Sequence, residues 1–432
     1  MMRWAIDDIL PAIQRQYRED KRPWIVGYSG GKDSTTLVQF VFHALMKLPA
    51  PERTKQVHIV SSDTLVEIPN VARMVTESLR KMQTAANKLE LPITTALVKP
   101  QVDDTFFVNI IGRGYPSPNR WFRWCTERMK IDPTSKYILD VVSKHGEAII
   151  LLGARKDESA TRAQVLSAYE IEGTVLRRHS TLPRCFVFAP LQDLTTQEVW
   201  FYLLGVKSPW GADNRELFAL YKRAEGGECP LVIDESTPSC GNSRFGCWTC
   251  TVVDRDKAME GFIDSGDEHL QPMLDFRNWL REIRDDAKLR EQQRKNGQQG
   301  LGPFKFKTRK EILRRLLLLE KTTGQKLITI DELLLIQRIW QEGDRFSADT
   351  GCSVAAILRE TKGESAMASY LDLLEDSVDP VLERICTEHN LTPELLQRLR
   401  AAEERVAHLQ RREGIFHEID DILDSVPAAA AR

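Results

Sequence analysis

The stretch SGGKDS, residues 29–34, follows directly after the apolar run WIVGY. A short apolar run bounded by glycine is typical of a buried strand, and the apolar pattern of residues 35–48 predicts a helix behind it. A turn needs one glycine, so two glycines beside a lysine indicate a backbone that approaches an anion. The spacing is not that of a Walker A loop, but the physics is related. The sequence therefore predicts a phosphate-binding loop formed by Ser29, Gly30, Gly31, Lys32, Asp33 and Ser34.

Strand and helix patterns alternate along roughly the first 220 residues. Apolar runs predict strands at 24–28, 57–62, 93–99 and 148–153. Helical patterns occupy residues 4–17, 35–48, 70–89 and 196–205, and a further segment after RKDES. This order predicts an α/β fold, with a parallel sheet and helices on both faces. Ligands of such sheets bind outside the carboxyl ends of the strands, which is where the glycine loop lies.

The composition changes further along the chain. We expect four parts: an α/β domain with the phosphate-binding loop at 1–225, a cysteine-rich segment at 226–284, a basic polar linker at 285–310 and a helical region at 311–432. Polar and glycine residues predict that the linker is exposed.

Charge and hydropathy exclude some classes of protein. The chain carries 60 Lys and Arg against 62 Asp and Glu, a formal net charge of −2, so any surface for a polyanion must be local. The chain contains no run of about 18 apolar residues, so the sequence predicts no membrane-spanning helix. The N-terminus lacks the pattern of a secretory signal. We therefore expect a cytoplasmic protein without a membrane partner, whose cysteines are thiols or metal ligands.

Four cysteines lie within 22 residues, in the spacing C-x10-C-x6-C-x2-C. They are Cys229, Cys240, Cys247 and Cys250. Four thiolates at such spacing suit a tetrahedral zinc or an iron–sulfur cluster, and spacing alone does not choose between them. The remaining cysteines at 185, 352 and 386 have apolar or helical surroundings and are interpreted as ordinary thiols.

A basic and aromatic segment surrounds Cys125. Arginines position phosphates and aromatic rings stack on exposed bases, so this segment predicts contact with nucleic acid. The residues expected to make it are Arg113, Arg120, Trp121, Arg123 and Arg128. Cations at 123 and 128 would also raise the thiolate fraction of Cys125. A second basic stretch spans residues 288–315 and can be a solvated face.

SGGKDS resembles the loop of the ATP-pyrophosphatase (PP-loop) superfamily, of adenine nucleotide alpha hydrolase-like fold. Three further segments resemble its phosphoadenosine-phosphosulfate (PAPS) reductase-like branch: SSDTLVEIP at 61–69, GARKDESATRA at 153–163 and APLQDLTTQEVWFYL at 189–203. The resemblance implies binding of ATP with Mg²⁺, adenylylation of an oxygen and release of pyrophosphate. It implies catalytic roles for Lys32 and Asp33, and it adds Asp63, Arg155, Glu158, Ser159 and Arg162 to the nucleotide site.

Sulfate-reducing relatives hold a [4Fe–4S] cluster with two adjacent cysteines and a distant C-x-x-C. This chain has Trp124 and Cys125 where those relatives have the pair. The resemblance therefore favours iron, and it leaves two roles for Cys125: a cluster ligand or a catalytic thiol that carries sulfur. The local spacing favours Cys229 as the fourth ligand, because closing a short loop costs less entropy.

CGNSRFGCWTC beside SGGKDS resembles the DndC-like sulfurtransferases of bacterial DNA phosphorothioation. This resemblance implies that sulfur replaces a non-bridging oxygen of a DNA phosphate. It implies DNA, a cysteine desulfurase and other phosphorothioation proteins as partners. The alternatives are an adenylyl-sulfate or PAPS reductase, a tRNA thiolase, and a non-catalytic module that binds DNA or a partner.

Overall fold

The computed structural model describes residues 6–156, 171, 174–224, 246–344 and 346–376, with a few single positions beyond. Its contacts divide the chain into two units, Met1–Ile357 and Leu358–Arg432. The boundaries expected at 225, 284 and 310 are not tested by this division and stay a prediction.

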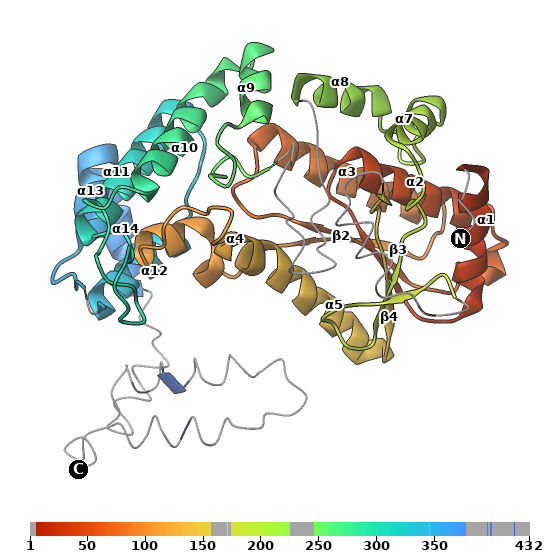
Figure 1. The fold of residues 1–432 in the computed structure, drawn as a ribbon, viewed down its shortest axis with the longest axis horizontal. Coiled ribbons are helices and arrows are strands. Elements are labelled where there is room, and N and C mark those ends of the chain that lie inside the picture. The colour runs from red at the N-terminus through yellow and green to blue at the C-terminus, as the bar shows by residue number, and fades with distance from the viewer. Residues whose placement is uncertain are drawn as a thin grey trace. The chain divides into compact units, whose positions relative to one another are not determined.

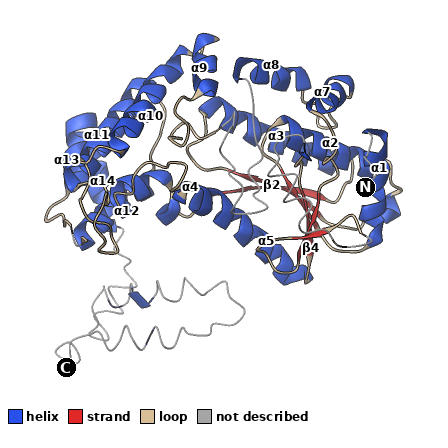
Figure 2. Cartoon of the chain, in the orientation of Figure 1, coloured by secondary structure: helices blue, strands red, loops and turns tan. Residues whose placement is uncertain are grey.

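A six-stranded sheet forms the centre of an α/β domain within the first unit (Figures 1 and 2). Its strands are β1 (Trp24–Gly27), β2 (Val57–Ser62), β3 (Ile93–Val98), β4 (Ala148–Leu151), β5 (Arg177–Arg178) and β6 (Cys185–Phe188). The order across the sheet is β3-β2-β1-β4-β6-β5, and only the short β5 pairs antiparallel. The chain therefore moves outward from β1 in one direction and then returns to begin β4 on its other side. The carboxyl end of β1 lies at this reversal, where such sheets bind ligands.

Helices cover both faces of the sheet, as expected (Figure 1). On one face, Ile138 and Val142 of α5 pack with Ile25, Ile150 and Val187 of three strands. On the other face, Trp24 meets the edge of Tyr17 from α1, with ring centroids 5.2 Å apart. Because side chains alternate along a strand, Trp24 and Ile25 point to opposite helical layers. The helices of this α/β domain are α1 (Ile6–Glu19), α2 (Lys32–Met46), α3 (Pro69–Lys88), α5 (Asp132–His145), α7 (Thr196–Gly205) and α8 (Asn214–Ala224).

The segment between β3 and α5 carries Cys125. It contains the short helices η2 (Val102–Asp104), η3 (Val108–Gly112), α4 (Trp124–Thr126) and η4 (Glu127–Ile131). A further short helix, η1 (Ala50–Glu52), precedes β2. Aromatic side chains hold this segment in place, because Trp124 is buried and stacks on Phe106 with centroids 5.5 Å apart.

More helices follow the cysteine-rich segment. They are α9 (Lys257–Asp264), η6 (Glu268–Leu270), α10 (Gln271–Arg284), α11 (Phe306–Thr323) and α12 (Ile330–Glu342). Helix α12 packs on the segment before Cys125, where the Trp340 indole donates to the Ile111 carbonyl at 3.0 Å. Two later helices are α13 (Ser353–Lys362) and α14 (Glu364–Asp376), so the expected helical content of the C-terminal region is confirmed.

The loop at 285–305 contains no helix or named strand, and most of its residues are exposed or half-buried as expected, but Arg290 and Phe304 near its two ends are buried. The Arg290 guanidinium donates to the carbonyls of Gly302 at 2.5 Å and Arg284 at 2.5 Å. The polar composition predicted exposure to solvent, whereas the Arg290 guanidinium is buried and finds its hydrogen-bond acceptors among nearby backbone carbonyls.

None of the helices in the described part of the chain is both long enough and apolar enough to cross a membrane.

The buried Arg309 joins α11 to the rest of the first unit. It donates to the carbonyls of Phe304 at 2.9 Å and Gly112 at 3.2 Å, and it pairs with Asp344 at 3.2 Å. Arg309→Met would leave these acceptors without a partner, so we expect the free energy of unfolding to fall by about 3 kcal/mol. Urea unfolding followed by circular dichroism measures this. Lys307→Met, an exposed change on the same helix, is the control and should change stability little. Equal effects of the two substitutions would contradict this role for Arg309.

Candidate active site

The glycine loop lies between β1 and α2, and each of its two glycines is present for a different structural reason. Gly30 has a φ of +75°, and a Cβ there would lie 2.6 Å from Val75 Cγ2 of α3. Gly31 is the N-cap of α2 and has extended backbone. The first turn of α2 therefore begins at Lys32, at the carboxyl edge of the sheet, and the amides of such a turn have no acceptor within their own helix. This helix start lies where the sequence predicts an anion site, which stays a prediction.

The two serines of the loop bond to the loop itself. The amide of Ser29 donates to Ser34 Oγ at 3.1 Å, and the amide of Gly31 donates to Ser29 Oγ at 3.3 Å. The Ser34 hydroxyl donates to the Gly31 carbonyl at 3.1 Å. These hydroxyls fix the shape of the loop.

A buried carboxylate joins two cations at the start of α2. Asp33 Oδ2 lies 2.6 Å from Lys32 Nζ, and Asp33 Oδ1 lies 2.6 Å from Arg155 Nε. All three side chains are less than 10% exposed. Breaking one partner of such a buried set leaves an uncompensated charge, which is strongly destabilising. The group therefore holds a net positive charge next to the anion site.

Arg155 also binds the segment that leads into α7. Its Nη1 donates to the Leu194 carbonyl at 3.0 Å, and its Nη2 donates to Thr196 Oγ1 at 3.0 Å. The chain after β4 approaches α2 closely, because a Cβ on Gly153 would lie 2.9 Å from the backbone of Asp33. The structure thus brings Arg155, which the family resemblance placed in the nucleotide site, against the phosphate loop.

The loop after β2 begins with Asp63, the other described residue expected in the nucleotide site. Asp63 Oδ1 accepts the amide of Leu65 at 2.9 Å, and its Oδ2 lies 3.7 Å from Lys99 Nζ. The next residue, Thr64, donates to Glu67 at 2.8 Å and lies 3.3 Å from Cys247 Sγ. One short loop therefore contacts the cysteine-rich segment directly.

Cys247 and Cys250 lie in one turn, in which the amide of Cys250 donates to the Cys247 carbonyl at 2.9 Å. The turn is fastened to the loop after β2, since the amide of Trp248 donates to the Val66 carbonyl at 2.9 Å. On its other side the buried Arg277 of α10 donates to the Cys250 carbonyl at 2.7 Å.

Burial raises the pKa of the Cys247 thiol well above its ordinary value, and the Glu67 carboxylate raises that pKa further. Lys130, on the Cys125 segment, acts in the opposite direction. A buried thiolate at this position needs a cation, which a metal ion supplies. Among the described residues, no three candidate ligands gather. The pair at 247 and 250 fits two of the four positions of an iron–sulfur cluster. The Cys229 and Cys240 positions lie outside the described residues.

The Cys125 segment pairs several of its cations internally. Arg128 forms an ion pair with Asp104, and Arg113 forms one with Asp103 at 2.5 Å. Cys125 itself is half-buried in α4. The Arg128 guanidinium is therefore paired with a carboxylate of the same segment.

Arg120 and Trp121 stand at the tip of a tight turn. The Asn119 side chain accepts the amides of Trp121 at 2.8 Å and Phe122 at 2.9 Å, so the turn is rigid. Trp121 is 88% exposed, and Arg120 is exposed too. An aromatic ring held out into solvent is available to a partner. Arg123 is half-buried beside this turn.

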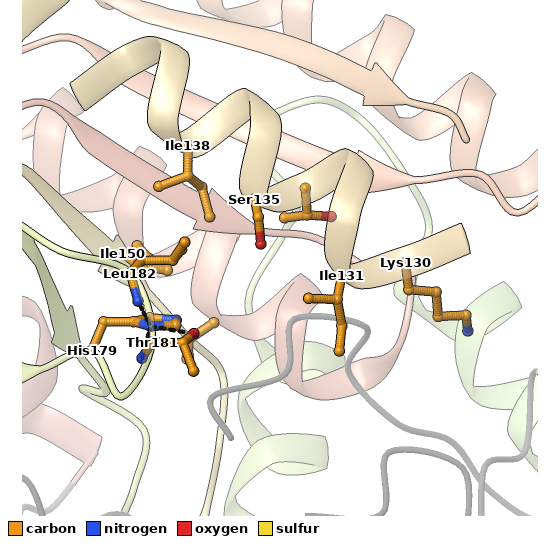
Figure 3. A pocket seen from close by; sticks show the side chains of 10 residues that line it. Lys130, Ile131, Ser135, Ile138, Ile150, His179, Thr181 and Leu182 are labelled. Atoms are coloured by element: carbon orange, nitrogen blue, oxygen red, sulfur yellow. Dashed lines mark hydrogen bonds between the residues drawn. The ribbon is translucent and has the colours of Figure 1, made fainter. Parts of the chain in front are cut away.

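A pocket of about 390 Å³, open to solvent, lies between α5 and β4 (Figure 3). Its wall is mainly apolar, with Ile131, Ile138, Ile150, Leu152 and Leu182, and its polar groups are Lys130, Thr134, Ser135, His179 and Thr181. Leu152 is three residues before Arg155, so the pocket and the phosphate loop share one edge of the sheet. Burial lowers the pKa of His179 to about 4, which keeps its imidazole neutral.

Sequence reasoning missed Tyr221 and Arg277. Tyr221 of α8 accepts the amide of Lys32 at 3.1 Å through its hydroxyl. No local signal identifies these two residues, because each lies on a helix that comes later in the chain than its partner. Thr64 and Glu67 lie within SSDTLVEIP, but the resemblance gave them no role beside the cysteines. The predicted nucleotide contacts Glu158, Ser159 and Arg162 lie outside the described residues and stay predictions.

A model of the phosphoadenosine phosphosulfate reductase domain matches residues 23–253, which is more than half of the chain. The chain belongs to the PAPS reductase domain family. The predicted membership of the PAPS reductase-like branch is thereby confirmed, and with it an enzyme superfamily. The narrower DndC-like identity stays a prediction.

One curated relative, an uncharacterized protein of Methanocaldococcus jannaschii, is 23% identical over 242 residues. The match covers 56% of this chain and 39% of that protein, so the chain spans about two fifths of its length.

Two solved structures are similar at low overlap. A PAPS reductase of Candida auris in complex with phosphate is 14% identical, with a TM-score of 0.28, and the match covers 50% of this chain and 93% of that one. The U34-tRNA thiolase NcsA of Methanococcus maripaludis with its [4Fe-4S] cluster is 13% identical, with a TM-score of 0.30, and the match covers 65% of this chain and 80% of that one. TM-scores this low support no inference about activity.

The cysteine turn generates a prediction about iron. Protein purified without oxygen should be brown and contain iron, and Cys247→Ser should lose most of both, because the turn provides two neighbouring thiolates. Iron analysis and visible absorption measure this outcome. Cys352→Ser removes a half-buried thiol elsewhere and should keep its iron. Colourless parent protein with stoichiometric zinc would contradict the choice of iron.

Proposed function

We propose that the protein is an ATP-dependent sulfurtransferase that activates a DNA phosphate and replaces one non-bridging oxygen with sulfur. The observation that carries the proposal is the buried group of Lys32, Asp33 and Arg155 at the first turn of α2. It gives the glycine loop a fixed positive charge. The cysteine turn contacts the loop after the neighbouring strand β2, through Thr64. Activation and sulfur chemistry thus have neighbouring sites on one sheet edge.

The phosphate loop would bind the β- and γ-phosphates of ATP. The amides of the first turn and the Lys32 ammonium would stabilise the charge that develops on the leaving pyrophosphate. Mg²⁺ would enter with ATP and neutralise part of the same charge. Both oxygens of Asp33 already contact cations, so its role is to orient Lys32 and Arg155.

The reaction would take two displacements. An oxygen of the DNA phosphate attacks the α-phosphorus of ATP, the new P–O bond forms, and pyrophosphate leaves. The terminal sulfur of a persulfide on Cys125 then attacks the DNA phosphorus and expels AMP. A second thiol cleaves the S–S bond, which releases the phosphorothioate and leaves a disulfide for a dithiol reductant. A cysteine desulfurase would supply the persulfide sulfur.

The DNA acceptor is supported by the surface beside Cys125. Arg120 and Trp121 offer a cation and a stacking ring at the tip of a rigid turn. Tyr115 lies close to both basic stretches, because Arg128 is 5.8 Å and Lys295 is 5.4 Å from its ring centroid. Two basic segments that are far apart in sequence thus adjoin each other. Such a surface suits a phosphate backbone with an exposed base.

A PAPS reductase is the second candidate, and the family match over residues 23–253 favours it. A reductase would release sulfite from an adenylylated sulfate with two electrons from a dithiol, which becomes a disulfide, and it would need no nucleic acid. The two functions are therefore separated by their products.

The test is mass spectrometry for phosphorothioate dinucleotides in the DNA of the host. We expect them in cells with the gene and not in cells without it. Lys32→Ala should remove at least nine tenths of the signal, because the loop keeps its amides but loses the charge of the Lys32 ammonium, worth about 1.4 kcal/mol or more. Lys47→Ala, an exposed change at the end of the same helix, is the control. Unmodified DNA, with sulfite released by the purified protein, would establish the reductase instead.

A further inference from the structure

Tyr221 occupies a position at the phosphate loop that an anion would use. The amide of Lys32 belongs to the first turn of α2 and has no partner within its own helix. It donates to the Tyr221 hydroxyl of α8 at 3.1 Å. Amides at this position of a helix bind phosphate oxygens, so a neutral oxygen lies where a charged one is expected.

The surroundings of Tyr221 hold this oxygen in place. The residue is 5% exposed, and its ring meets the edge of Trp200 with centroids 5.1 Å apart. Lys32 Nζ lies 5.7 Å from the centroid of the ring. A Cβ on Gly31 would lie 3.1 Å from the hydroxyl, closer than most real contacts of this kind. The second glycine of the loop therefore also makes room for Tyr221.

We propose that the Tyr221 hydroxyl is a displaceable substitute for a phosphate oxygen. It releases the Lys32 amide when the polyphosphate of ATP binds, and it returns when pyrophosphate leaves. A charged oxygen forms a stronger hydrogen bond than a neutral hydroxyl, so ATP displaces it. The returning hydroxyl spares the buried amide from being left without a partner, which favours release of the product. This inference rests on the proposed function. It adds Tyr221 as a positioning residue that favours release of the product, pyrophosphate.

The direction in which one substitution changes the affinity for pyrophosphate tests the inference. Tyr221→Phe keeps the ring against Trp200 and removes the competing oxygen. We expect the variant to bind pyrophosphate about threefold to tenfold more tightly, through slower dissociation. Titration calorimetry with pyrophosphate on the full chain gives the affinity, and stopped-flow displacement gives the dissociation rate.

Tyr202→Phe is the matched control. Tyr202 lies on the adjacent helix α7 with its ring stacked on Phe40, centroids 4.0 Å apart, and no described contact joins it to the loop. Its removal should leave the affinity for pyrophosphate unchanged. Weaker binding by Tyr221→Phe would mean that the hydroxyl is itself a ligand of the anion, and equal binding would mean that it does not compete. Either result overturns the inference.

Two further results separate this inference from the proposed function. Parent protein that binds neither ATP nor pyrophosphate would overturn both. Parent protein that binds pyrophosphate, with no change in Tyr221→Phe, would overturn only the inference. A further readout needs no variant of Tyr221. Pyrophosphate should change the fluorescence emission of Trp200. This emission is obtained by subtracting the emission of Trp200→Phe from that of the parent. An unchanged difference would contradict the displacement of Tyr221.

Discussion

The candidate site depends on the two ion pairs formed by the buried carboxylate of Asp33. This carboxylate lies between Lys32 on its own helix and Arg155 from the segment after β4, at 2.6 Å from each. A charge buried so deeply is tolerated only with partners, and Asp33 has two. Because Arg155 also reaches the residue that begins α7, at Thr196, one ionic group joins three elements that are separate in sequence. The positive end of α2 is thereby fixed against the sheet.

The fold could be predicted where the signal is local. Strands β1 to β4 are apolar runs of four to six residues between helical patterns, which is sufficient to indicate a parallel sheet. Helix α7 was predicted to its exact bounds, and the structure has a capping box formed by Thr195 and Glu198 at its start. Strand β5 was missed because two arginines have no apolar pattern, and β6 was missed although it is as short and as apolar as β4, which was predicted. The buried residues near the ends of the loop at 285–305 were missed for a different reason, since composition does not reveal which carbonyls will accept from an arginine.

The candidate site could be predicted only as far as motifs extend. Ser29 to Ser34 follow from the glycine pair, and Arg155 follows from the family resemblance. Tyr221 could not be found in this way, because it lies 189 residues from the amide that it accepts. Thr64 and Cys247 are similarly distant, at 183 residues. Contacts of this kind result from the order of the strands, in which the ends of β1 and β2 are neighbours, and not from any pattern within a window of sequence.

The loop after β2 gives the site its physical connection. Asp63 and Thr64 are consecutive, and the threonine contacts Cys247 while the aspartate holds the turn at Leu65. Glu67 of the same loop lies 3.9 Å from the thiol and 4.0 Å from Lys130 of the Cys125 segment. The negative Glu67 carboxylate opposes ionisation of the Cys247 thiol and pairs with the Lys130 ammonium. The charge state of the cysteine turn therefore depends on residues from two other segments. Any movement of the loop after β2 would therefore alter the surroundings of Cys247, because Thr64 of that loop lies 3.3 Å from its sulfur.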